Sequence, residues 1–304
     1  MTSPTSLVAT LIANSTLIDH ATLARVRPAL PAAGEAVWLD PGRAADIPFS
    51  ASPDADQRAL GEALRELAPG VDVVVQPSAG RRKKLFLADM DSTMIGQECI
   101  DELAAFVGLK EHVAAITERA MRGEIEFEPA LRERVALLKG LPAAVVDEVI
   151  EHHITLTPGG RLAIATMRAH GAYTCLVSGG FTLFTDRIAA MIGFDEARAN
   201  TLEIDGDKIA GQTLAGVVRE PIFGRDSKRA ALIELRDRLG LAEHETMATG
   251  DGANDLAMIT ESGLGVAYHA KPKVAAAAPA RIEHGDLTAL LYIQGYRRDE
   301  FAAV

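Results

Sequence analysis

The residues that could do chemistry lie in four short segments of the chain. Asp89 and Asp91 stand two positions apart after an apolar run, and Ser178 is followed by two glycines before a helical pattern. Lys228 lies near the start of another helical pattern. Taken alone, each segment has an ordinary explanation as a turn, a helix cap or a solvated lysine. The fourth segment reads GDGAND and contains Asp251, Asn254 and Asp255.

Together these segments predict a site for a cation and a phosphate group. Several clustered carboxylates do not all ionise readily unless a cation is present. Oxygen ligands without a nearby His or Cys favour Mg²⁺ over Zn²⁺. The Ser178 hydroxyl, the backbone N–H groups that follow it and Lys228 offer hydrogen bonds and positive charge to a phosphate.

The elements that must position these residues follow an alternating pattern from Leu85 onward. Strand-like and helical segments alternate, which predicts an α/β fold with a parallel sheet covered by helices on both faces. Three of the four segments follow predicted strands, and ligands of such sheets bind at the carboxyl ends of the strands. A long helical tract over about 98–153 interrupts the alternation, and a further helix begins near Thr157 and Pro158. The pair Asp205-Gly206 predicts a hairpin turn.

Residues 1–78 have a different pattern, which predicts a separate small module. Strand-like runs at 6–14, 35–40 and 71–78 alternate with helical runs at 19–30 and 56–67. This order is typical of a ferredoxin-like α/β sandwich. Residues 79–84 are expected to form a linker, and its basic run at 81–84 is expected to be solvated.

Composition excludes several classes of function. The 304-residue chain has a formal net charge of −11 and a pI near 5.2, which argues against nucleic acid or an anionic membrane as its main partner. No apolar run reaches the ~18 residues of a membrane span. Two cysteines, Cys99 and Cys175, are expected to be reduced core thiols. We therefore expect a cytoplasmic protein.

In their order, the four segments resemble the four motifs of the haloacid dehalogenase-like hydrolases over residues 85 to about 295. Within that superfamily the run DMDSTMIGQECIDELA, with VSGGFTLF and GDGANDLAM, resembles the phosphoserine phosphatase family. The resemblance implies a Rossmann-like domain at 85–304 with a helical cap inserted at about 94–157. It also implies an activity, the hydrolysis of O-phospho-L-serine with Mg²⁺.

The resemblance further implies a role for each motif residue. Asp89 is the expected nucleophile, and Asp91 is the expected general acid and base, with a pKa raised with help from neighbouring negative charge. The expected metal ligands are Asp89, the backbone carbonyl of Met90 and Asp251. The remaining motif residues are expected to bind the phosphoryl group or to orient the metal and the lysine: Ser178, the Gly179 amide, Lys228, Asn254 and Asp255.

Residues of the helical tract are expected to select the substrate. Phosphoserine carries an ammonium and a carboxylate, for which the resemblance implies Glu98 and Arg134, with Met121 and Phe127 lining the pocket. Without the resemblance, Met121 and Phe127 read as core of the cap and Arg134 as a solvated charge. A related phosphatase or phosphotransferase with another small phosphomonoester as substrate remains an alternative.

The N-terminal module weakly resembles amino-acid-sensing ACT-type modules. A ligand sensor, a dimerisation unit that would make the protein a homodimer, and a folding scaffold all remain open for it. His152-His153 is expected to be a helix end rather than a metal site.

Overall fold

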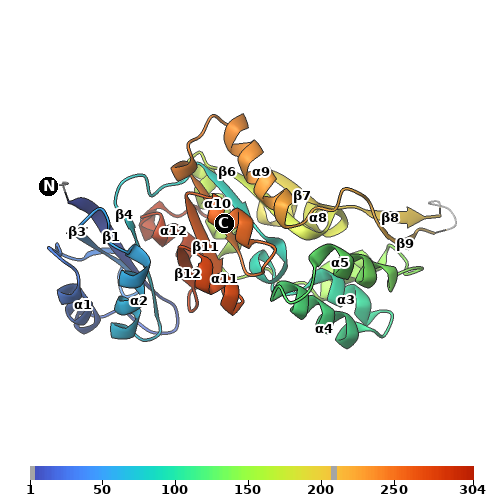
Figure 1. The fold of residues 1–304 in the computed structure, drawn as a ribbon, viewed down its shortest axis with the longest axis horizontal. Coiled ribbons are helices and arrows are strands. Elements are labelled where there is room, and N and C mark those ends of the chain that lie inside the picture. Colours follow the sequence, from blue (N-terminus) through green and yellow to red (C-terminus); the bar gives the residue numbers. More distant parts are fainter. Residues whose placement is uncertain (1–3, 207–210) are drawn as a thin grey trace.

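A computed structural model describes residues 4–206 and 211–304. Three bodies follow one another along the long axis of the molecule (Figure 1). They are a four-stranded N-terminal sheet with two helices, a central six-stranded sheet, and a group of helices at the opposite end. We refer to the last two as the core and the cap.

The N-terminal module has the predicted ferredoxin-like topology. Strands β1 (Thr5–Ala13), β2 (Val37–Asp40), β3 (Ala44–Ala51) and β4 (Val71–Pro77) form an antiparallel sheet in the order β2-β3-β1-β4. Strand β3 was not named from the sequence, since Asp46 and Pro48 interrupt its apolar pattern. Helices α1 (His20–Val26) and α2 (Gln57–Leu67) pack on one face and begin at the aspartate N-caps that strengthen such starts.

The other face of the N-terminal sheet packs on the core. Ile12, Ala44 and Val74 belong to the same apolar cluster as Tyr292 of α12 (Ala289–Ile293). Alternate residues of the same strands, including Leu11 and Val73, face the two helices instead. The sheet is therefore covered on both faces.

The expectation of a solvated basic linker at 81–84 is wrong for two of its four residues. The Arg81 guanidinium bonds Asp46 and the backbone carbonyls of Tyr292 and Ile293, at 3.1 Å from each carbonyl oxygen. Lys83 is buried, and its ammonium donates to the carbonyls of Gly80 and His244. Arg82 and Lys84, the other two residues, are exposed. Because all four residues are basic, hydropathy does not distinguish the exposed positions from the enclosed ones.

The core is the predicted parallel sheet, in the order β12-β11-β10-β5-β6-β7. Its central strands are β5 (Leu85–Ala88), β6 (Tyr173–Phe181) and β10 (Thr246–Gly250), and all three lead toward the predicted site residues. The other strands are β7 (Glu196–Asn200), β11 (Leu264–Tyr268) and β12 (Ala280–Ile282). Strand β7 was not predicted, because its sequence EARAN lacks an apolar run.

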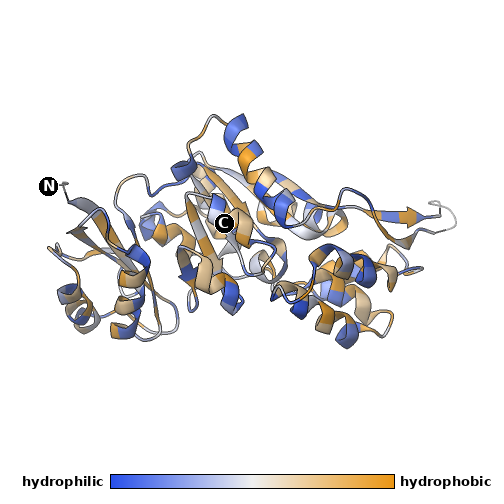
Figure 2. Ribbon diagram, viewed as in Figure 1, coloured by the Kyte–Doolittle hydropathy of each residue, from blue (hydrophilic) through white to orange (hydrophobic). Residues whose placement is uncertain are grey.

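Helices cover both faces of the core sheet. They are α7 (Gly160–Ala169), α8 (Thr182–Ile192), α9 (Arg225–Arg238), α10 (Leu256–Glu261), α11 (Pro272–Ala277) and α12. Short 3₁₀ turns lie at Arg27–Ala29, Glu243–Glu245 and Arg298–Glu300. Hydrophobic and hydrophilic residues alternate along α9 (Figure 2), whose Leu232 and Leu235 pack on the sheet.

The cap consists of four helices rather than one tract. They are α3 (Cys99–Ala105), α4 (Lys110–Met121), α5 (Phe127–Ala136) and α6 (Val145–His152), and they lie between β5 and α7. Strands β8 (Leu202–Asp205) and β9 (Thr213–Val218) form a hairpin that runs from the core to the cap (Figure 1). The Leu214 carbonyl accepts from the Gly140 N–H at 2.8 Å.

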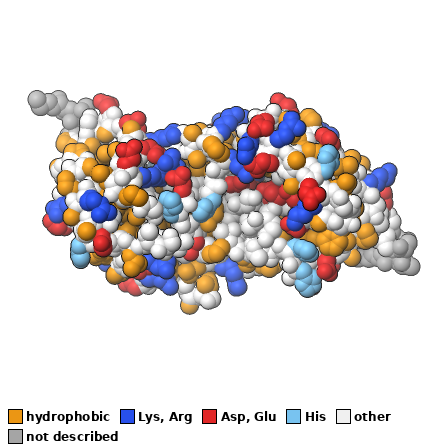
Figure 3. Space-filling view, turned by 90° about the horizontal axis from the view of Figure 1, so that it is seen from below, with side chains coloured by type: hydrophobic (Ala, Val, Ile, Leu, Met, Phe, Trp, Pro, Cys, Tyr) orange, Lys and Arg blue, Asp and Glu red, His pale blue; other side chains and the backbone are white. Residues whose placement is uncertain are grey.

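The hairpin predicted at Asp205-Gly206 is present as the antiparallel pair β8 and β9. Among the described residues the last printed pair joins Asp205 to Thr213, and residues 207–210, which follow the predicted turn, lie outside the described residues. Across the described ranges, no helix is long and apolar enough to cross a membrane. On the face shown in Figure 3, Lys and Arg side chains are interspersed with Asp and Glu.

Candidate active site

The first two carboxylates lie on either side of an abrupt change in chain direction. Strand β5 ends at Ala88, and Asp89 continues it with an N–H donated to the Thr249 carbonyl at 3.0 Å. A turn at Met90–Met94 follows, in which Ser92 has a positive φ of 53°. This conformation is strained for a serine and is typical of functional turns. The turn brings Asp91 back beside Asp89 in a buried position.

The carboxylate of Asp91 is held by hydrogen bonds from two elements. The Cys99 N–H, at the start of α3, donates to Oδ1 at 2.8 Å, and the Ser178 hydroxyl donates to Oδ2 at 3.0 Å. Burial raises the pKa of Asp91, and the bonds from Cys99 and Ser178 partly oppose that rise. Burial is thus the main cause of the rise, and the expected contribution of neighbouring negative charge is not among the larger causes.

Lys228 is fully buried, contrary to its simplest explanation as a solvated lysine. Its ammonium donates to Asp89 Oδ1 and to Asp255 Oδ1, the latter at 2.7 Å. Burial lowers the pKa of Lys228, but the charges of Asp255 and Asp89 outweigh this effect and raise it above its ordinary value. Lys228 is therefore a permanent positive charge next to Asp89.

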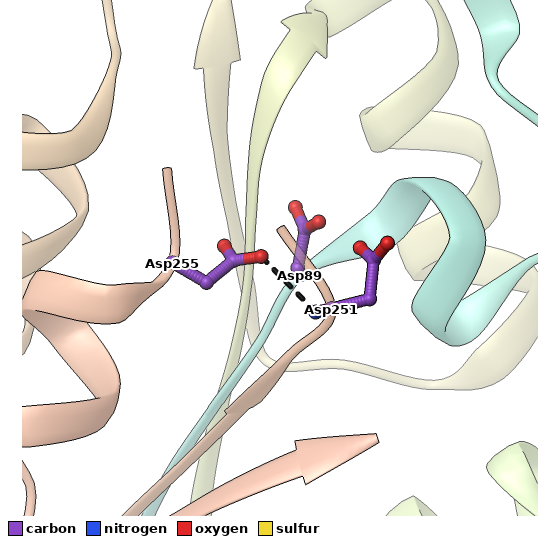
Figure 4. Close-up of side chains that lie close together, drawn as sticks. All are labelled: Asp89, Asp251 and Asp255. Atoms are coloured by element: carbon purple, nitrogen blue, oxygen red, sulfur yellow. Dashed lines mark hydrogen bonds between the residues drawn. The ribbon is translucent and has the colours of Figure 1, made fainter. Parts of the chain in front are cut away.

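Three buried carboxylates form a cluster that can hold a cation. One oxygen each from Asp89, Asp251 and Asp255 lies within 4.8 Å of the others (Figure 4). Burial, followed by repulsion from Asp255, raises the pKa of Asp251 to about 7, and burial raises that of Asp89 well above its usual range. A divalent cation would remove this repulsion, so the donor set fits a hard metal ion.

Both carboxylate oxygens of Asp255 already accept hydrogen bonds within the protein. Asp255 accepts from Lys228 and, through Oδ2, from the N–H groups of Asp251 at 3.2 Å and Gly252 at 3.0 Å. Gly250 allows this close packing, since a Cβ there would lie 2.4 Å from the Asp255 carboxyl carbon. The Met90 carbonyl, an expected metal ligand, accepts from the Ile95 N–H at 3.0 Å and keeps one lone pair.

The residues expected to recognise the substrate line one small cavity above the carboxylates. Its volume is about 20 Å³, enough for about one water molecule. Both core and cap contribute to its wall, which is formed by Asp89, Asp91, Glu98, Ile100, Met121, Phe127, Leu131, Arg134, Gly179, Gly180, Phe181 and Asn254. The structure thus brings together the predicted residues of cap and core; the predicted residues that do not line the cavity are Met90, Ser178, Lys228, Asp251 and Asp255.

Arg134 is buried in the cap and bonded to it. Its Nε donates to the Ala130 carbonyl at 3.0 Å and its Nη1 donates to the Thr117 hydroxyl at 2.9 Å. Thr117 in turn lies 2.6 Å from the carboxylate of Asp101. No sequence pattern indicated Thr117 or Asp101, because each lies on a different helix from Arg134 and only packing joins them to it.

Glu98 also lines the cavity. The Ser92 hydroxyl donates to its Oε1 at 2.7 Å. Burial, followed by repulsion from Asp91, raises the pKa of Glu98 well above its ordinary value. A cation that enters the cavity would stabilise the ionised form of Glu98.

The remaining cavity residues form close contacts between cap and core. The Phe127 ring lies against Gly179 and Gly224, where a Cβ would come within 2.7 Å and 3.2 Å of it. Asn254 Oδ1 is buried and lacks a hydrogen-bond partner among the described residues, as expected for a group that meets a ligand. Asn200, which the sequence did not indicate, holds the Gly179 carbonyl at 2.8 Å through Nδ2.

Two side features agree with their simpler interpretations. Cys99 and Cys175 are buried free thiols. His152 is the last residue of α6, and His153 Nδ1 lies 3.6 Å from Glu102 and away from the carboxylate cluster.

Comparison with known proteins agrees with this geometry. Residues 86–260 match the model of the haloacid dehalogenase-like hydrolase family. A phosphoserine phosphatase of Polaromonas sp. is 45% identical over 232 residues, which are 74% of this chain and 97% of that protein. A solved haloacid dehalogenase family hydrolase of Salmonella enterica serovar Typhi is 29% identical, with a TM-score of 0.82 over 95% of this chain and 98% of that one.

A further solved structure carries information on chemistry. It is a phospho-aspartyl intermediate analogue of a phosphoserine phosphatase, 38% identical, with a TM-score of 0.65 over 69% of this chain and 98% of that one. The chain described here belongs to the haloacid dehalogenase-like hydrolase family and, within it, groups with the phosphoserine phosphatases.

Proposed function

We propose that the protein hydrolyses O-phospho-L-serine to L-serine and inorganic phosphate. The observation that carries the proposal is the composition of the cavity, in which a carboxylate (Glu98) and a guanidinium (Arg134) stand above the buried pair Asp89 and Asp91. These are the charges that the ammonium, the carboxylate and the phosphate of phosphoserine require. The identity to phosphoserine phosphatases supports the same substrate.

Asp89 is the proposed nucleophile. One of its carboxylate oxygens forms a bond to phosphorus while the bond from phosphorus to the serine oxygen breaks, which leaves an aspartyl phosphate. Lys228 next to Asp89 is placed to neutralise charge on the phosphoryl oxygens, together with the Ser178 hydroxyl and the Gly179 N–H. The relative solved as a phospho-aspartyl analogue supports this intermediate.

Asp91 is the proposed proton donor and acceptor. The serine oxygen leaves with the bonding electron pair and takes a proton from Asp91. In the second step a water gives a proton to Asp91 and attacks phosphorus, and the bond between phosphorus and Asp89 breaks. Burial supports this role, because it raises the pKa of Asp91 and keeps the carboxyl protonated to a higher pH.

Mg²⁺ is the proposed cofactor, held by Asp89, Asp251 and the Met90 carbonyl. When bound, Mg²⁺ would offset the negative charge of the phosphoryl group and of the carboxylate cluster. Asp255 is proposed to orient Lys228 and the 251–252 backbone rather than to bind the metal, because both of its oxygens already accept hydrogen bonds.

The cap must move during turnover. A cavity of about 20 Å³ is too small for phosphoserine, so the substrate enters only when α4 and α5 separate from the core. Closure then brings Arg134 and Glu98 onto the amino-acid end of the substrate and excludes bulk water.

The N-terminal module is proposed to be a scaffold rather than a sensor. Both faces of its sheet are covered, by its own helices and by the core, which leaves neither face for a ligand or a second copy. A homodimer, if formed, would use another surface, and sedimentation of the full chain tests that point. We also propose a cytoplasmic location, which the two buried free thiols support.

Phosphate release from a panel of phosphomonoesters tests the proposed function. We expect O-phospho-L-serine to be preferred over phosphosugars and aryl phosphates, activity to be lost on metal chelation, and Asp89→Asn to be inactive while remaining folded. Equal turnover of all esters would remove the substrate assignment. Substantial activity of Asp89→Asn would remove the nucleophile assignment.

A further inference from the structure

An ion pair joins the cap to the core outside the cavity. The Lys271 ammonium, on the segment between β11 and α11, lies 2.6 Å from Glu118 Oε2 on α4 of the cap. Both side chains are partly exposed, with 29% and 41% of their surface accessible. Neither residue lines the cavity, and neither belongs to the motifs singled out from the sequence.

On the core side, Lys271 projects from a segment that is held firmly. Its N–H donates to the Asp251 carbonyl at 2.9 Å, and the His269 N–H donates to the Ile282 carbonyl at 2.9 Å. The His269 ring bonds the Gly285 carbonyl at 2.9 Å, and His269 has a positive φ of 44°. Such a conformation persists only where the surroundings fix it, so Lys271 has a rigid base.

On the cap side, Glu118 lies next to the residue that supports Arg134. Thr117, which precedes it on α4, accepts the hydrogen bond from the Arg134 guanidinium. Three residues further on, the Met121 carbonyl accepts the Ala253 N–H of the core at 2.9 Å. Glu118 also pairs with Arg122 of its own helix at 2.7 Å. An attachment at Glu118 therefore fixes the part of α4 that carries both the Arg134 support and the cap–core hydrogen bond.

We propose that Lys271 is a positioning residue that holds the cap closed through Glu118, so that Arg134 reaches the carboxylate of the bound substrate. The inference rests on the proposed function and extends it. Lys271 itself makes no contact with the reacting atoms. An exposed pair of this kind contributes at most about a fivefold change in the equilibrium between closed and open cap, which is enough to bias closure while still allowing opening for product release.

The test compares Lys271→Met with Arg122→Met, a matched control that removes a charge from the same Glu118 without touching the cap–core contact. We expect Lys271→Met to raise KM for O-phospho-L-serine by about two- to fivefold, with kcat changed by less than about twofold. Arg122→Met should leave KM unchanged, and Lys271→Arg should retain the wild-type KM because it keeps the charge.

Amide hydrogen exchange gives a readout that does not depend on chemistry. The Ala253 N–H, whose bond to Met121 crosses the junction, should exchange faster in Lys271→Met than in the wild type or Arg122→Met. A double-mutant cycle combines Lys271→Met with Glu118→Gln. The KM and the Ala253 exchange rate of the double variant should be no higher than those of either single variant.

Equal KM and equal Ala253 exchange in wild type and Lys271→Met, or additive effects in the cycle, would overturn the inference. If the wild type released no phosphate from O-phospho-L-serine, the proposed function would fall instead, and the exchange comparison would still decide whether Lys271 holds the cap.

Discussion

The core meets the rest of the chain at two junctions, and different interactions hold them. Toward the N-terminal module, largely buried charges bond backbone groups: Arg81 spans Asp46 and the end of α12, and Asp72 accepts from three consecutive N–H groups at 283–285. Toward the cap, the contacts beside the cavity include a partly exposed ion pair, one backbone hydrogen bond from Ala253 and the ring of Phe127, and a second exposed ion pair joins α6 to α8.

This difference corresponds to what each junction does. Removing one partner from a buried charged network leaves the other uncompensated, so separation of such a junction is costly at every opening. A partly exposed ion pair is replaced by water at little cost. The first junction is suited to remain closed for the life of the protein, and the second is suited to open once per turnover.

The largest expected effect is on stability and lies at the N-terminal junction. Arg81→Met should lower the free energy of unfolding by about 3–5 kcal/mol, because it leaves the Asp46 carboxylate buried without its partner. Denaturant unfolding measures the loss, and kcat/KM per folded molecule should stay at the wild-type value. Arg82→Met is the control, since its partner Glu300 is partly exposed, and it should cost about 1 kcal/mol or less.

The second effect is on specificity and lies at the cap. Arg134→Met should lower kcat/KM for O-phospho-L-serine by about 30-fold or more, as expected when one member of a desolvated charge pair is removed. Turnover of 4-nitrophenyl phosphate, which has no carboxylate, should change far less. Arg132→Met, on the exposed face of the same helix, serves as control. A parallel loss on both esters would mean that Arg134 supports the cap fold and not the substrate.

A third change tests whether the two junctions are independent. Asp72→Asn should lower the free energy of unfolding by about 1–3 kcal/mol, because one oxygen acceptor is lost among buried N–H groups. We expect KM to remain within about twofold of the wild type. The N–H of Gly285 bonds Asp72 and its carbonyl bonds His269, so a larger rise in KM would show that the N-terminal junction also sets the position of Lys271.

A fourth change concerns the pH dependence of stability. Burial lowers the pKa of Lys83 to about 8, from an ordinary value of 10.5. Between these values the unfolded chain binds more protons than the folded one, so this residue makes the folded state more stable as pH rises from about 8 to 10.5. Lys83→Met should remove that rise in denaturant unfolding. Lys84→Met, at an exposed position, should retain it.

The sequence predicted those parts of the structure that have a regular hydropathy pattern or contain a recognisable motif. Periodicity predicted the parallel core, the ferredoxin-like order and the helical nature of the cap. It did not predict β3 or β7, whose apolar residues are interrupted. It also did not predict the hydrogen bonds of Arg81 to α12, because that helix lies more than 200 residues later in the chain. Thr117 and Asp101 were missed for the same reason, since tertiary packing alone brings them to Arg134.

The hairpin of β8 and β9 makes the cap a composite of two separate stretches of sequence. Its Leu214 exchanges backbone hydrogen bonds with Gly140 and Leu141, and Glu220 just beyond β9 pairs with Arg132 of α5. A cap transplanted between relatives by cutting only at about 94 and 157 would arrive without this half of its support. To exchange substrate preference between relatives, a graft must therefore include both residues 94–157 and the β8–β9 hairpin.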